Sequence, residues 1–109
     1  MKDKIEQYIK AIKAAEEASL SANKNEDGGT CNIDTVIINF KGWRQANIDQ
    51  VIKSSGINIS SPLSGLYKGY RFVNFSANGQ GNNRSRMVIA AKRKLVEMDI
   101  PATVYHQMD

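Results

Sequence analysis

The segment Thr-Val-Ile-Ile-Asn-Phe, at positions 35–40, is β-branched and almost entirely apolar. A run of this kind is typical of a central strand that is buried on both faces of a sheet. Gly42 follows it and breaks the pattern, and a polar loop over positions 23–34 precedes it. This strand therefore fixes the middle of the predicted sheet, and the rest of the chain is placed around it.

Three segments have the apolar spacing of amphipathic helices, in which residues three and four apart share a face. They cover positions 2–22, 44–55 and 84–98. Gly56 stands where a left-handed cap would end the second helix, and Pro101 lies just beyond the third. Each of the three is therefore predicted to pack one apolar face against the sheet or against another helix.

Two further strands are predicted at positions 70–75 and 103–108, which gives the order α-β-α-β-α-β. Strands that alternate with helices favour a small α/β domain of two or three layers. We expect one domain over residues 1–109, with an amphipathic helix at 1–22 and an α/β core at 23–109. Its sheet has three strands, or slightly more, packed by the helices.

The bulk composition excludes several classes of protein. The chain has 109 residues, of which 41% are hydrophobic and 24% are charged, as in an ordinary globular domain. No apolar run approaches the ~20 residues that span a bilayer, so we expect no membrane partner and a cytoplasmic location. Cys31 and His106 are single, which excludes an intrachain disulfide and a cysteine-rich zinc site. No metal or cofactor is expected.

The charges are distributed unevenly. No acidic residue occurs between Gln50 and Val96, although the net charge of the whole chain is only +4. A segment of one sign projects a positive field that favours anionic partners. Alternatively, these cations form an ordinary solvated surface, balanced by the acidic N-terminal region if that region lies beside them in space. The cations of this segment are Lys53, Lys68, Arg71, Arg84, Arg86, Lys92, Arg93 and Lys94.

The strongest candidate site is the loop Gly-Gln-Gly-Asn-Asn-Arg-Ser-Arg at positions 79–86, which joins a predicted strand to a helix. Glycines allow a ligand to approach the backbone, and the amides of a helix N-terminus suit a phosphate. The pattern is neither a Walker A loop nor a full dinucleotide fingerprint, and a tight turn with an Asn or Ser cap would use the same residues. The predicted ligand-binding residues are Gly79, Gln80, Gly81, Arg84 and Arg86.

A second candidate is the segment Asp-Gly-Gly-Thr-Cys-Asn-Ile-Asp at positions 27–34. Thr30, Asn32 and Asp34 could bond a base or a ribose, although an Asx turn that starts the strand would use the same groups. Cys31 is interpreted as a small, half-buried side chain rather than a nucleophile, because only His106 could activate it.

Aromatic and polar side chains complete the set of candidates. Alternation along the last strand places Tyr105 and Gln107 on one face and His106 on the other. Tyr105 and Trp43 could stack on a nucleobase, although such residues also occur at the rim of a core.

The sequence leaves open whether these segments meet. The 79–86 loop follows a strand and the 27–34 loop precedes one, so a parallel sheet would hold them at opposite ends. A neighbouring protomer or antiparallel pairing would be needed to bring them together.

Three of these segments carry a resemblance. The chain resembles a family of small phage and prophage proteins in the segments DGGTCNID (27–34), GQGNNRSR (79–86) and VYHQMD (104–109). The corresponding patterns of the family are DGGTCNFD, GQG-x-x-R-(T/S)-(R/K) and VYYQMD. The chain departs from that pattern at Ile33 and at His106, where the family has aromatic residues. The second departure argues against a catalytic histidine. The resemblance spans about residues 21–109 and implies a counter-defence protein in the host cytoplasm, without a mechanism.

Four functions are compatible with these observations. The first is a sponge that sequesters a nucleotide second messenger of bacterial immunity, with the ligand held between protomers of a homo-oligomer. The second is an anti-CRISPR protein that inhibits Cas9 or another host nuclease by direct binding. A nucleic-acid-binding module and a nucleotide phosphodiesterase are the others. We favour the sponge, because the basic, glycine-rich loop comes without an obvious catalytic set.

Overall fold

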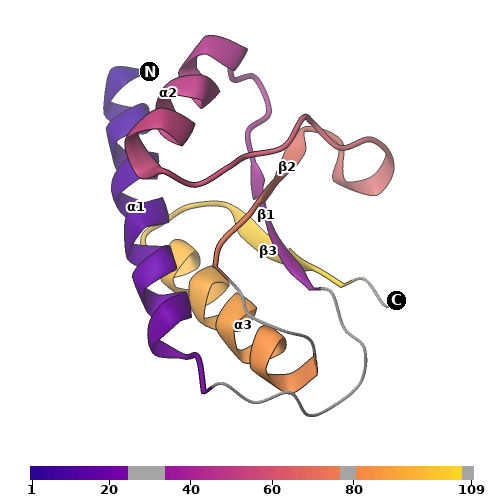
Figure 1. Cartoon of the computed structure of the whole chain (residues 1–109). Helices are drawn as coiled ribbons and strands as arrows, with labels where there is room; N and C mark the ends of the chain where they lie inside the picture. The colour runs from indigo at the N-terminus through magenta and orange to yellow at the C-terminus, as the bar shows by residue number, and fades with distance from the viewer. Residues whose placement is uncertain (25–33, 77–80, 107–109) are drawn as a thin grey trace.

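Helices and strands alternate along the chain in this computed structural model, which describes residues 1–24, 34–76 and 81–106. The predicted α-β-α-β-α-β order and the α/β class are both confirmed (Figure 1). A short 3-10 helix, η1 (Gly65–Tyr67), precedes the second strand. The main elements are α1 (Lys2–Ser21), β1 (Thr35–Asn39), α2 (Gln45–Ser55), β2 (Tyr70–Val73), α3 (Gly81–Glu97) and β3 (Ala102–Tyr105).

The sheet has the strand order β2-β1-β3, and β1 pairs antiparallel with both of its neighbours. Val36 of β1 lies opposite Val73 of β2 and Val104 of β3. The start of β1 is therefore next to the ends of both other strands. Antiparallel pairing, which the sequence left open, is thus the arrangement within this chain.

The molecule has two layers, with the helices on one face of the sheet (Figure 1). Val36 and Ile38 belong to the core that includes the buried faces of α1, α2 and α3. Ile37 points to the other face and is also fully buried. Phe72 lies directly opposite it on β2, and the Phe72 ring packs edge-on against Tyr105 at 5.3 Å. The prediction that β1 is buried on both faces is confirmed, with aromatic rings covering its second face.

The helix ends follow local rules. Gly56 has φ +74° and donates its N–H to the carbonyl of Ile52 at 2.8 Å, as predicted for a left-handed cap. The third helix begins at Gly81, earlier than the Arg84 start that the sequence suggested. The early start places Asn83 in its first turn, where the side chain is 1% exposed.

Buried Asn83 joins two helix ends. Its Oδ1 accepts the backbone N–H of Lys24 at 2.9 Å, and its Nδ2 donates to Oδ1 of Asn23 at 2.9 Å. These bonds tie the chain after α1 to the first turn of α3. Asn83, read in the sequence as part of a ligand loop, is therefore a structural residue that positions the start of α3.

Candidate functional site

The ends of four elements meet at one corner of the domain. Thr35, which begins β1, lies opposite Tyr105, which ends β3. The adjacent strand β2 ends at Val73, opposite Val36, and α3 begins after the loop that follows β2. Antiparallel pairing therefore brings together the described parts of the three segments that the sequence singled out.

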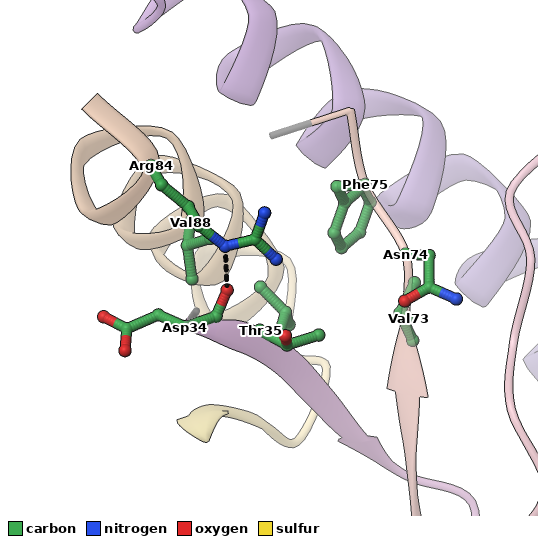
Figure 2. A pocket seen from close by; sticks show the side chains of 8 residues that line it. Asp34, Thr35, Val73, Asn74, Phe75, Arg84 and Val88 are labelled. Carbon is green, nitrogen blue, oxygen red and sulfur yellow. Dashed lines mark hydrogen bonds between the residues drawn. The ribbon is translucent and has the colours of Figure 1, made fainter. Parts of the chain in front are cut away.

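Arg84 and Asp34 provide the direct contact between two of these segments. The Nε–H of Arg84 donates to the backbone carbonyl of Asp34 at 2.9 Å. The terminal nitrogens of Arg84 have no hydrogen-bond partner within residues 1–24, 34–76 and 81–106. Figure 2 shows them turned toward Thr35 and Phe75, whereas the Asp34 carboxylate points to the opposite side of the strand. The guanidinium is thus anchored to the Asp34 carbonyl through Nε, and its two terminal nitrogens remain available as hydrogen-bond donors.

A small cavity lies in front of this guanidinium, between α3 and the sheet (Figure 2). We call it the Arg84 cavity. Its volume is about 30 Å³, which is room for about two waters or one phosphoryl group but not for a whole nucleotide. A ligand larger than phosphate would therefore extend beyond it. The lining residues are Asp34, Thr35, Val36, Val73, Asn74, Phe75, Arg84 and Val88.

The start of α3 adds to the positive character of the corner. The first turn of this helix carries no acidic residue, so no side chain of that turn offsets the partial positive charge of its amides. Gly81 is buried there with φ +71°, a conformation that glycine adopts without strain. Nη1 of Arg86 donates to Oδ1 of Asn83 at 3.3 Å, which places Arg86 in the same network.

Asp34 also contacts the only histidine of the chain. Its Oδ1 lies 3.2 Å from Nδ1 of His106, and the side chain of His106 is 72% exposed whereas that of Asp34 is 3% exposed. Asp34 therefore contacts two side chains, Arg84 through its backbone carbonyl and His106 through its carboxylate. His106 is not among the ligand-binding residues predicted from the sequence, because no local pattern links it to a residue so far away in the chain.

Tyr105 belongs to an aromatic cluster on the outer face of the sheet. Its ring centroid lies 6.0 Å from that of Tyr67 and 5.3 Å from that of Phe72, and Tyr67 also meets Tyr70 at 5.8 Å. All four are partly exposed. Tyr67 and Tyr70 are also predicted by the sequence as aromatics that could stack on a base, but Phe72 was missed. The contacts of Tyr67 and Phe72 with Tyr105 depend on strand order rather than on sequence spacing.

Trp43 lies apart from this corner. Its ring packs against those of Tyr8 at 4.6 Å and Phe40 at 5.2 Å, in the core near the other end of β1. The structure therefore does not bring Trp43 together with Arg84 and Tyr105. The remaining predicted ligand residues lie outside the described residues, namely Thr30, Asn32, Gly79, Gln80 and Gln107.

One cation of the acid-free segment is not on the surface. Arg71 is buried, and its Nη1 donates to Oε1 of Gln45 at 2.9 Å and to the carbonyl of Ser60 at 3.2 Å. Burial lowers the pKa of Arg71 below its usual range, against the opposing effect of the nearby Asp49 charge. Arg71 serves the fold, so the surface charge of this segment comes from its other cations.

The structure gives two further results about function. Within the described ranges, no cluster of His, Cys, Asp and Glu side chains is arranged to hold a metal ion, and no helix is long and apolar enough to cross a membrane. The fold and the corner together define a two-layer α/β domain with a small cavity lined by Arg84. The chain matches no protein-family model, no curated protein and no solved structure.

Proposed function

We propose that this protein binds a phosphate-bearing nucleotide at the Arg84 cavity and sequesters it. In the setting that the phage resemblance implies, the ligand is a nucleotide second messenger of host immunity, bound in the host cytoplasm. The observation that carries the proposal is the guanidinium of Arg84, which is anchored through Nε and offers two donors to a cavity of phosphate size. Two parallel N–H donors match the oxygens of a phosphoryl group.

The surroundings support an anion over a neutral ligand. The N-terminus of α3 contributes partial positive charge, and Arg86 lies two residues beyond Arg84, where its Nη1 donates to Oδ1 of Asn83. Asp34 is the acidic residue that lines the cavity, and its carboxylate is turned away from Arg84 (Figure 2). A phosphoryl group in the cavity would therefore meet donors without facing that carboxylate.

The remainder of a nucleotide would lie beside the cavity. Thr35 lines the cavity and pairs with Tyr105. The Tyr105 ring lies on the outer face of the sheet, so a base stacked on it would have to pass around the start of β1 from a phosphate on the helix side. Aromatic rings stack on nucleobases at about 1–3 kcal/mol per base. The small size of the cavity also supports the expectation that a second copy of the chain completes the site.

A second candidate function is hydrolysis of the bound nucleotide. The observation that favours it is the pair formed by Asp34 and His106, in which a buried carboxylate orients an exposed imidazole. Such a pair can act as a general base when a substrate proton comes within hydrogen-bonding reach. Sequestration and hydrolysis therefore differ in the fate of the ligand, which can be measured.

The test is to capture the ligand. Purified protein is incubated with cyclic dinucleotides, cyclic trinucleotides and ADP-ribose derivatives, washed, and heated, and the released material is identified by mass spectrometry. We expect one intact nucleotide to be recovered. Recovery of a cleaved nucleotide would replace sequestration with hydrolysis. If nothing is recovered from any member of the panel, both are wrong, and direct binding of a host nuclease becomes the better hypothesis.

A further inference from the structure

The two edges of the sheet differ in how they are covered. The outer side of β2 is bonded to the segment at positions 58–63. The N–H of Ser60 donates to the carbonyl of Phe72 at 2.9 Å, and the N–H of Leu63 donates to that of Tyr70 at 2.8 Å. No such segment lies along the outer side of β3 in the part of the chain that the structure describes. Within residues 1–24, 34–76 and 81–106, the sheet is therefore covered at its β2 edge and uncovered at its β3 edge.

The register shows which groups face the open edge. The N–H of Asn39 donates to the carbonyl of Pro101 at 2.9 Å, so this pair is of the hydrogen-bonded type. Hydrogen-bonded and non-hydrogen-bonded pairs alternate along an antiparallel ladder. Thr103 and Tyr105 therefore bond to β1, whereas the N–H and C=O groups of Ala102 and Val104 point outward.

A groove runs beside this edge, between β3 and α3. Its volume is about 300 Å³, and it is lined by Ile89, Lys92, Arg93, Thr103, Val104 and His106. Lys92 and Arg93 lie three and four residues after Ile89 on one face of α3, and Val96 continues that face with 48% of its surface exposed. The helix thus extends past the edge of the sheet and presents an apolar and basic stripe where a further strand would pack. We call this region the β3 groove.

We propose that an extended, acidic segment of a partner protein adds to β3 as a fourth strand and fills the β3 groove. The outward groups of Ala102 and Val104 supply main-chain hydrogen bonds, as in other cases of strand addition. Lys92 and Arg93 select acidic side chains on the face of the added strand that lies over α3. Ile89 and Val96 offer apolar contact on the same face.

Charge decides between this partner and a second copy of the chain. Two copies paired through β3 about a two-fold axis would bring Lys92 and Arg93 of each protomer toward those of the other. Like charges held close together oppose association, and the groove has no acidic lining residue to offset them. A nucleic acid would satisfy the cations but would leave the outward groups of Ala102 and Val104 without strand partners. This inference is independent of the Arg84 cavity.

The probe is a fluorescein-labelled octapeptide that alternates valine with glutamate, and its control alternates valine with lysine. Binding is followed by fluorescence anisotropy, and exchange of the Ala102 and Val104 amides is followed by NMR. We expect the acidic peptide alone to bind, and to slow exchange of both amides at least about tenfold because they become hydrogen-bonded. The proposal is wrong if either amide exchanges as fast at saturation as in the free protein, or if the lysine peptide binds equally well.

Charge-reversal variants separate the groove from general electrostatics. Lys92→Glu with Arg93→Glu should weaken binding of the acidic peptide by about tenfold or more, whereas Lys10→Glu with Lys13→Glu, on the exposed face of α1, should change it little. Equal losses in the two double variants would overturn the proposal. If the Ala102 and Val104 amides become protected from hydrogen exchange as the protein concentration rises, without any peptide, the proposal is wrong and a second copy of the chain occupies the groove. If an octathymidylate binds through Lys92 and Arg93 without protecting the two amides, the proposal is wrong and a nucleic acid is the partner of the β3 groove.

Discussion

Replacing Arg84 with glutamine should weaken binding of the captured nucleotide by about a hundredfold. Arg84 donates Nε–H to the carbonyl of Asp34 and turns two further donors toward the cavity. A hydrogen bond to a charged group contributes about 1.5–3 kcal/mol, and every ~1.4 kcal/mol is a tenfold change in affinity. Loss of both phosphate contacts therefore removes roughly 3 kcal/mol or more. Isothermal titration calorimetry with the nucleotide from the capture assay measures the effect.

Two further variants make this result specific. Arg84→Lys keeps the charge but loses the planar fork and the anchoring bond to Asp34, so we expect an intermediate loss of about tenfold. Arg44→Gln makes the same chemical change at an exposed position before α2 and should leave the affinity unchanged within about twofold. If Arg84→Gln binds the nucleotide as tightly as Arg44→Gln does, the ligand does not occupy the Arg84 cavity.

Replacing Asn83 with alanine should lower the free energy of unfolding by about 2–3 kcal/mol. This substitution leaves the N–H of Lys24 and the side chain of Asn23 without the partners that Asn83 supplies. Lys24 is exposed and Asn23 is half-buried, so each of the two lost hydrogen bonds costs about 1–1.5 kcal/mol. Asn82 is the matched control, because it stands next in the chain and is exposed. Asn82→Ala should change the stability by about 0.5 kcal/mol or less.

Urea unfolding followed by circular dichroism measures both variants. A fall in the midpoint for Asn83→Ala with an unchanged slope is the expected pattern, because the extent of the folded core stays the same. Equal midpoints for Asn82→Ala and Asn83→Ala would contradict a structural role for Asn83.

The sequence predicts the local elements well and their assembly poorly. Apolar spacing located the helices, and Gly56 marked the end of α2 because a left-handed cap is a local property. Strand direction is not local, since it depends on contacts between residues far apart in the chain. The sequence therefore left open whether the segment ending at Asp34 and the segment holding Arg84 meet, and antiparallel pairing brings them together.

The same limit applies to single side chains. The sequence places Arg71 among the surface cations, but β2 turns its side chain to the helix side of the sheet, where Gln45 and Ser60 bond it. The strand predicted over 103–108 ends at Tyr105, so alternation does not place His106, and it could not indicate that His106 meets Asp34. The assembled fold determines which polar groups are buried and which of them pair. Local sequence patterns therefore cannot predict these contacts.

The most direct test of the central claim is an NMR titration of the protein with inorganic pyrophosphate, which carries the phosphoryl chemistry without a base. The claim predicts that the Nε–H signal of Arg84 and the methyl signals of Val73 and Val88 move together along one saturable curve, and that Arg84→Gln abolishes the methyl shifts while Arg44→Gln preserves them. If these signals stay fixed, or if the only shifts lie at Lys92 and Arg93, the Arg84 cavity is not an anion site and the proposed function is wrong.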